Sequence, residues 1–183
     1  MSGYSNWSGS TPWLWDDLRF AASVFNPIGA ASDPDVENSS GLLLFDATST
    51  EYYYVLAQMP HTWKVGSAIE PHVHWSPTTT DTGNVLWRLD YQVRNPVGDT
   101  AFDFTSGWST LDVLAAAGGT MAPRVSSFGS VNMTGFGISS LIVFRINRIG
   151  GDASDTYAAD ARLYEFDLHY QQAQEGSRGQ TTV

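Results

Sequence analysis

NVLWRLDYQVR, residues 84–94, decides the fold, because large apolar side chains occupy every second position of this stretch. Successive side chains of a β-strand point to opposite faces of the sheet. One face of the stretch therefore consists of Val85, Trp87, Leu89, Tyr91 and Val93, while the other face is mainly polar. The pattern predicts a half-buried strand that presents its apolar face to a core.

Short apolar runs of the same kind recur from Gly41 onward, separated by Gly, Pro, Asp and Asn residues that favour turns. We expect strands within residues 42–45, 52–58, 68–75, 84–94, 108–114, 138–148 and 157–170. In the last run, apolar and more polar side chains alternate again, with Tyr164, Phe166, Leu168 and Tyr170 on the apolar face. This run could pair with residues 84–94. About seven or eight strands at this spacing predict an all-β fold, a single jelly-roll-like β-sandwich, with one short helical stretch at residues 111–117.

Residues 1–40 show no helical or strand period and are rich in Ser, Gly, Asn, Pro and Asp. An ordinary disordered segment is poor in aromatic residues, yet this one holds several. We predict an extended, irregular N-terminal arm over residues 1–40, followed by one β-sandwich domain over residues 41–183. The arm is expected to contact a partner protein or a neighbouring subunit through its large side chains, Trp7, Trp13, Trp15, Phe20 and Phe25.

The composition excludes several classes of function. The 183 residues contain no cysteine, which excludes a disulfide framework, a thiolate nucleophile and a Cys-ligated zinc site. The formal net charge is -10 and Lys64 is the only lysine, so we expect no nucleic-acid partner. Residues 1–10 lack the features of a signal peptide, and no stretch approaches the roughly 20 apolar residues of a membrane span. We therefore expect a soluble protein with no membrane partner.

The pair His72 and His74 is the strongest candidate for a chemical site. Alternation along a strand places both imidazoles on one face, and two imidazoles about 7 Å apart can chelate one metal ion. However, no aspartate or glutamate stands downstream at the spacing that would complete such a motif. We therefore expect no metal and no cofactor, and we assign His72, His74 and Glu70 to an interface between subunits.

Other catalytic patterns are weak. The acidic loop over residues 150–160 lacks the ligand order of an EF-hand, and backbone hydrogen bonds of a turn explain its composition. The chain has neither a Gly-x-Ser-x-Gly elbow nor a phosphate-binding loop. We expect no catalytic residue and no enzymatic activity. Trp63 and Trp108, which lie beside turns, are the candidates for stacking against a ligand such as a glycan.

Several segments together resemble a family of structural proteins from tailed bacteriophages, and the resemblance covers about residues 13 to 172. The segments are WDDLRF at 15–20, GLLLFD at 41–46, QMPHTWK at 58–64, PHVHW at 71–75, GNVLWRLDY at 83–91 and EFDLHYQ at 165–171. The Met-Pro-His and Pro-His-Val-His-Trp segments are the most specific parts. No catalytic residues belong to the family pattern.

Phage proteins of this size and type resemble either capsid decoration (cement) proteins or the terminal domains of head or tail fibres, and they are commonly trimers. A fibre protein normally has a long shaft before its terminal domain, whereas only about forty irregular residues precede the first expected strand here. The resemblance therefore implies a non-enzymatic virion protein, assembled in the host cytoplasm. It would bind the major capsid protein or other virion proteins and stabilise the head shell. The alternative is a receptor-binding or structural domain of a fibre that recognises host surface glycan.

Two expected strands are apolar on both faces, namely those that contain residues 52–56 and 141–144. A two-layer sandwich buries only one face of each strand, and a large apolar patch is unusual on a soluble monomer. The sequence therefore predicts a symmetric homo-oligomer, either a trimer or a dimer, in which neighbouring subunits cover these faces.

Overall fold

The computed structural model describes residues 14–24 and 29–173, and nearly all of the regular structure in these ranges is β-strand. The strands are β1 (Leu14–Ala21), β2 (Asp35–Val36), β3 (Leu43–Phe45), β4 (Thr50–Gln58), β5 (Ile69–Pro77), β6 (Asn84–Arg94), β7 (Ser109–Ala116), β8 (Arg124–Ser127), β9 (Leu141–Ile149) and β10 (Ala161–Gln172). One turn of 3₁₀ helix, η1 (Ala22–Val24), follows β1. The predicted all-β class is confirmed.

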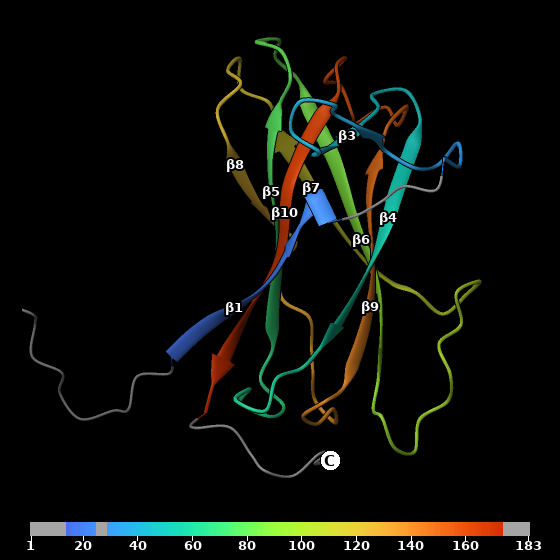
Figure 1. The fold of residues 1–183 in the computed structure, drawn as a ribbon, viewed down its shortest axis with the longest axis vertical. Helices are drawn as coiled ribbons and strands as arrows, with labels where there is room; N and C mark the ends of the chain where they lie inside the picture. Colours follow the sequence, from blue (N-terminus) through green and yellow to red (C-terminus); the bar gives the residue numbers. More distant parts are fainter. Residues whose placement is uncertain (1–13, 25–28, 174–183) are drawn as a thin grey trace, which may run out of the picture.

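The strands form two antiparallel sheets. Sheet A has the order β2-β3-β10-β5-β8, and β1 also pairs with β10. Sheet B has the order β4-β9-β6-β7. The chain passes between the sheets repeatedly, as in a jelly roll, and the long strands run along the long axis of the molecule (Figure 1). The structure is therefore the predicted jelly-roll-like sandwich.

The core lies between the two sheets and is rich in aromatic rings. Trp87 from β6 and Trp75 from β5 are both fully buried, with ring centroids 5.9 Å apart in an edge-to-face arrangement. Phe45 packs its ring edge-to-face on Trp87 at 5.2 Å. Val85 and Leu89 are also fully buried, so the apolar face predicted for residues 84–94 is the core face of β6.

The apolar face of β10 differs from the prediction at one residue. Phe166, Leu168 and Tyr170 are buried as expected, but Tyr164 is only partly buried. The register between β10 and β5 shifts between Leu163 and Glu165, which marks a β-bulge at Tyr164. The bulge turns the Tyr164 side chain away from the core. On the outer face, the Tyr164 hydroxyl donates a hydrogen bond to the Ser76 hydroxyl at 2.9 Å.

Part of the segment expected to be an irregular arm is a strand. Residues 14–21 form β1, which pairs with residues 165–172 of β10 in the same chain (Figure 1). The partly buried Leu18 and Phe20 pack against the core, which explains why this stretch is ordered by its own domain. β2 also lies within residues 1–40, so the folded domain begins before the expected boundary at residue 41.

Two further expectations were wrong. Residues 111–117 are not helical, because most of them belong to β7, whose Leu111, Val113 and Ala115 face the core side and alternate with exposed residues. The strands that contain residues 84–94 and 157–170 do not pair, because β6 belongs to sheet B and β10 to sheet A. Among the described residues, no helix is long and apolar enough to cross a membrane.

Candidate functional site

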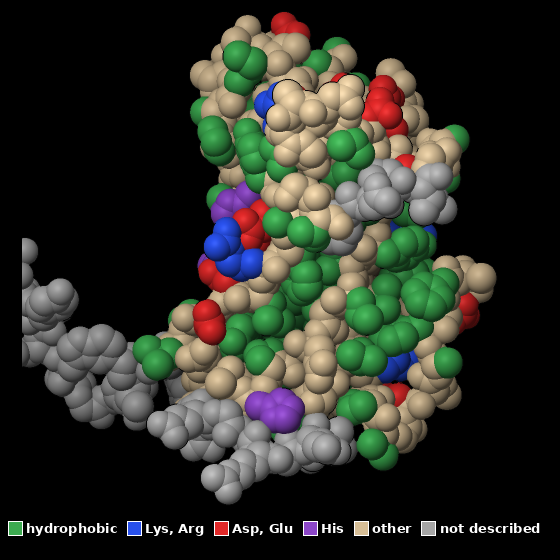
Figure 2. All heavy atoms as spheres, in the orientation of Figure 1, with side chains coloured by type: hydrophobic (Ala, Val, Ile, Leu, Met, Phe, Trp, Pro, Cys, Tyr) green, Lys and Arg blue, Asp and Glu red, His purple; other side chains and the backbone are tan. Residues whose placement is uncertain are grey.

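The outer face of sheet A carries a cluster of ionisable side chains. His72 and His74 share one face of β5, as predicted, while Val73 and Trp75 point into the core. Asp167 on β10 is the direct cross-strand partner of His72. The strand pairing thus brings the Asp167 carboxylate beside two imidazoles that lie far from it in the sequence. Figure 2 shows His, acidic and Arg side chains gathered at the left edge, where Figure 1 has β1, β5 and β10.

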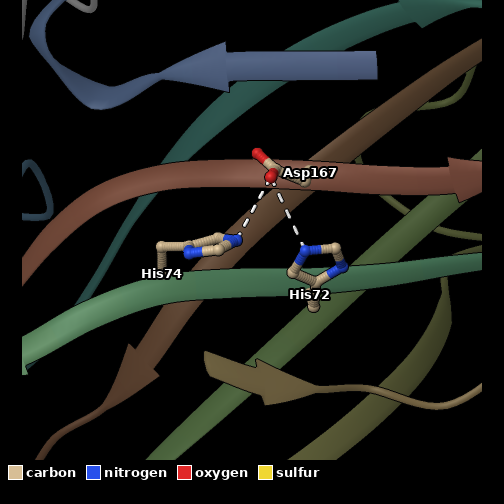
Figure 3. A group of neighbouring side chains, drawn as sticks. All are labelled: His72, His74 and Asp167. Atoms are coloured by element: carbon tan, nitrogen blue, oxygen red, sulfur yellow. Dashed lines mark ion pairs between the residues drawn. The ribbon is translucent and has the colours of Figure 1, made fainter. Parts of the chain in front are cut away.

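The three side chains converge on one point. His72 Nε2 lies 3.5 Å from Asp167 Oδ2, and His74 Nε2 lies 3.2 Å from the same oxygen (Figure 3). One potential ligand atom from each residue lies within 4.8 Å of the others. The Asp167 and His72 side chains are 6 % and 8 % exposed, whereas the His74 side chain is 38 % exposed. The cluster is therefore buried on the side of Asp167 and His72 and open to solvent on the side of His74.

Charge attraction within the cluster controls its protonation. Burial alone would raise the pKa of Asp167, but hydrogen bonding with His72 and Glu165, together with the charges of the His74 and His72 imidazoles, outweighs burial and lowers it. Burial likewise opposes protonation of His72, but Asp167 and the Glu70 carbonyl outweigh it and raise the pKa of this imidazole. Asp167 is therefore a carboxylate at neutral pH.

The neighbouring ionisable groups have partners of their own. His169 Nε2 lies 2.8 Å from Asp17 on β1, and the His169 ring packs edge-on against His72 with centroids 4.5 Å apart. Arg19 on β1 forms a two-pronged ion pair with Glu165. Glu70 contributes its backbone carbonyl, which lies 3.4 Å from His72 Nδ1. Among the described residues, no hydrogen bond or ion pair joins the Glu70 side chain to this cluster.

Asp167 was not predicted as a partner of the two histidines, because periodicity shows which face a side chain occupies but not which strand lies beside it. The expectation that no carboxylate accompanies the histidine pair was wrong for this reason. The correct pairing of β5 with β10 would have placed Asp167 opposite His72. No spacing rule along the chain carries that information.

The outer face of sheet B carries an aromatic surface, formed by Tyr52, Tyr54, Phe104, Trp108 and Arg145. The ring centroid of Tyr54 lies 6.2 Å from those of Phe104 and Trp108. The Arg145 guanidinium lies 5.3 Å from the centroid of Tyr52 and 5.0 Å from that of Trp108. Phe104 and Trp108 come from the segment between β6 and β7, which therefore covers part of the sheet.

An apolar groove of about 330 Å³ continues this surface. It is lined by Tyr54, Val55, Leu56, Phe102, Phe104, Leu141 and Val143. Tyr54 is 42 % exposed, Leu56 61 % and Phe104 55 %. Figure 2 shows hydrophobic side chains gathered along the right-hand side, where Figure 1 has β4, β9 and the segment after β6. The outward faces of residues 52–56 and 141–144 are thus apolar and partly exposed in the single chain.

The aromatic residues singled out from the sequence have different environments. Trp63 is 2 % exposed and belongs to the core, so the prediction that it stacks on a ligand was wrong. Trp108 is partly exposed and belongs to the aromatic surface. In the predicted arm, Trp15 is 48 % exposed, and the Phe20 ring packs on Phe166 at 6.1 Å. Trp7, Trp13 and Phe25 lie outside the described residues.

The acidic loop that follows β9 has a structural role. Asp155 forms a bidentate ion pair with Arg148, at 2.9 and 2.7 Å, and both side chains are fully buried. Arg148 also donates hydrogen bonds to the backbone carbonyls of Phe45, Tyr157 and Ala159. The Asp155 carboxylate therefore anchors the loop to Arg148 of β9.

Comparisons with protein-family models and with curated protein sequences found no match. Among solved structures, the chain is similar to the CBM36-1 domain of a multidomain xylanase from the hindgut metagenome of Trinervitermes trinervoides. The TM-score is 0.46 and the identity 10 %, over 88 % of this chain and 100 % of that chain. It is also similar to TmCBM61, solved in complex with β-1,4-galactotriose, with TM-score 0.37, identity 10 % and coverage of 86 % and 88 %. Latent PorU from Porphyromonas gingivalis matches with TM-score 0.36 and identity 7 %, over 93 % of this chain but 14 % of PorU. At such low identities and TM-scores we base no functional inference on these neighbours.

Proposed function

We propose that the chain is a non-enzymatic structural protein of a tailed bacteriophage particle, a capsid decoration protein that binds the head shell as a homotrimer. The observation that carries the proposal is the aromatic surface with its groove on sheet B. A surface of this kind is typical of a protein that works by contact with other proteins. The resemblance of the sequence to phage structural proteins supports the virion as the place where those contacts form.

A second copy of the chain is the proposed occupant of the groove. The groove lining contains no charged side chain, and exposed apolar side chains such as Leu56 and Phe104 stand at the groove itself. The same surface therefore carries both a groove and exposed apolar side chains that could insert into a groove. Copies arranged around a symmetry axis can cover one another's apolar surface in this way. Each large apolar side chain that becomes fully buried contributes about 1.5 to 3 kcal/mol.

The interface is tested with two matched substitutions on sheet B. Leu56→Asp places a charge in the groove, whereas Leu114→Asp changes a leucine that is 51 % exposed on β7, outside the groove lining. Light scattering should give three times the 20.0 kDa chain mass for the wild type and for Leu114→Asp, and a monomer for Leu56→Asp. A wild type that remains monomeric over a wide concentration range contradicts the proposed trimer.

The capsid role is tested by locating the protein in intact particles. Gold-labelled antibodies against the chain should bind the phage heads, and purified protein should co-sediment with shells that lack it. Because β1 belongs to the folded domain, a deletion that tests the arm should remove residues 1–13 and leave Leu14 in place. This deletion should weaken shell binding while the sandwich stays folded. Antibody binding confined to the tail or its fibres would contradict the decoration role.

The second candidate is the recognition of host surface glycan at the end of a fibre. The partly exposed rings of Tyr54, Phe104 and Trp108 favour it, because such rings can stack on the apolar face of a sugar. A glycan array with the purified protein separates the two candidates. Binding that is lost in Trp108→Ala and kept in Trp15→Ala would support the glycan candidate over shell decoration.

A further inference from the structure

We propose that His72, His74 and Asp167 form a binding site for a divalent transition-metal ion such as Zn²⁺ on the outer face of sheet A. The proposal rests on the convergence of the two His Nε2 atoms and the Asp167 carboxylate (Figure 3). It is independent of the aromatic surface, which lies on the other sheet.

The spacing of the ligand atoms fits a metal ion. Zn²⁺ lies about 2.0 to 2.1 Å from imidazole nitrogen and carboxylate oxygen, so tetrahedral ligands stand roughly 3.4 Å from one another. The two observed separations between His Nε2 atoms and Asp167 Oδ2 are 3.5 and 3.2 Å. These two separations match a shared ion, and all three ligand atoms lie within 4.8 Å of one another.

The cluster also contains polar atoms that protein contacts leave unsatisfied. Within the described part of the chain, Asp167 Oδ1 and His74 Nε2 are buried and make no hydrogen bond, although His74 Nε2 lies 3.2 Å from Asp167 Oδ2. A buried polar atom without a partner costs about 1 to 3 kcal/mol. A cation held by the carboxylate and the imidazoles would offset that cost, which gives the unsatisfied atoms a function.

A second layer of contacts prepares the ligands. His72 Nδ1 lies 3.4 Å from the Glu70 carbonyl, and a proton on Nδ1 leaves the Nε2 lone pair free for a metal. His169 and Glu165 are engaged with Asp17 and Arg19, respectively, so the described part of the chain supplies three ligands. Water or another ligand would supply the fourth position. Two imidazoles and one carboxylate favour Zn²⁺, Co²⁺ or Ni²⁺ over Ca²⁺ and Mg²⁺.

Isothermal titration calorimetry with ZnCl₂ tests the site, using the full-length chain without a histidine tag after treatment with a chelator. We expect one Zn²⁺ per chain. His74→Ala and Asp167→Asn should each weaken Zn²⁺ binding by more than about tenfold. Substitution of residues that only hydrogen-bond to metal ligands already lowers metal affinity by about tenfold or more, and these two residues are ligands themselves. His61→Gln is the matched control, because His61 lies in the loop between β4 and β5, where it contacts Ser139, and is not part of the cluster.

A second readout separates loss of the site from loss of the fold. The His74 side chain is 38 % exposed, so His74→Ala should keep the circular dichroism spectrum and melting temperature of the metal-free wild type. Zn²⁺ should raise the melting temperature of the wild type and of His61→Gln but not of His74→Ala. The proposal is overturned if no stoichiometric binding of Zn²⁺, Co²⁺ or Ni²⁺ occurs, or if His74→Ala and Asp167→Asn bind as tightly as the wild type.

Discussion

Arg148 of β9 connects the end of β3 with the loop that precedes β10. It is fully buried, and its only carboxylate partner in the described structure is Asp155, while three backbone carbonyls take up its remaining donors. Arg148→Met would leave Asp155 as a buried charge without its charged partner, although the Leu86 backbone N–H would still donate a hydrogen bond to it at 2.9 Å. We expect a loss of about 3 to 5 kcal/mol of stability. Urea unfolding measures this loss.

The exposed pair between Arg88 and Asp112 provides the control for this prediction. Its side chains are 37 % and 41 % exposed, so Arg88→Met should cost less than about 1 kcal/mol. Equal losses in the two variants would show that burial of the Arg148 pair has no special role.

Glu51 predicts a specific dependence of stability on pH. Burial raises the pKa of its carboxyl from 4.5 to about 7, although a hydrogen bond from the Asp46 backbone N–H partly opposes the shift. The folded state therefore binds more protons than the unfolded state between these values, so this group makes stability fall as pH rises from about 4.5 to 7.

Glu51→Gln removes the titrating group and keeps an oxygen that accepts the Asp46 hydrogen bond. We expect the variant to be more stable than the wild type at pH 8, on the order of 1 kcal/mol, and equal to it near pH 4. Urea unfolding at the two pH values decides the point. A stability difference that is the same at both would refute the assignment to Glu51.

At the scale of elements, the sequence predicted core strands well and edge strands poorly. The bounds of β6 match the prediction at both ends, because its alternation is long and its inward side chains are large. β1 and β8 were missed, since each is mostly exposed and its pairing partner decides its conformation. The bulge at Tyr164 was missed as well, because a single inserted residue leaves no signal in an alternating pattern.

The same reasoning explains what could be predicted of the candidate sites. Alternation placed His72 and His74 on one face, and the consecutive apolar residues of β4 and β9 indicated an exposed apolar face. Asp167 and the position of Phe104 over sheet B depend on tertiary contacts, and local sequence does not encode them.

We expect β1 to open locally while the rest of the sandwich stays folded. Among the described strands it pairs only with β10, and Phe20 is the side chain that packs its ring on Phe166. Phe20→Ser should release β1, so hydrogen exchange of residues 14–21 should accelerate while that of β6 stays slow. Trp15→Ala alters a side chain that is 48 % exposed and should leave the exchange rates of β1 residues other than 15 unchanged. Faster exchange throughout β6 in Phe20→Ser would contradict the local opening.

At the scale of the whole molecule, the proposed trimer predicts a stability that depends on protein concentration. Subunit association stabilises the folded chain by mass action, so the melting temperature of the wild type should rise with concentration. Leu56→Asp should melt at a temperature that does not change with concentration, while Leu114→Asp should behave as the wild type. Scanning calorimetry over a hundredfold range of about 0.1 to 10 mg/ml measures both. A constant melting temperature for the wild type would count against the trimer.

The pairing of β1 with β10 also has a mechanical consequence. Leu14 and Gln172 are cross-strand partners, so the two ends of the described chain leave the sandwich from neighbouring points. Tension applied between these points would break the hydrogen bonds of the pair one after another, as in opening a zipper, instead of shearing them all at once. The pairing of β1 with β10 would therefore break at low force and lengthen the connection between the two points that are pulled. The aromatic core between the sheets would remain intact.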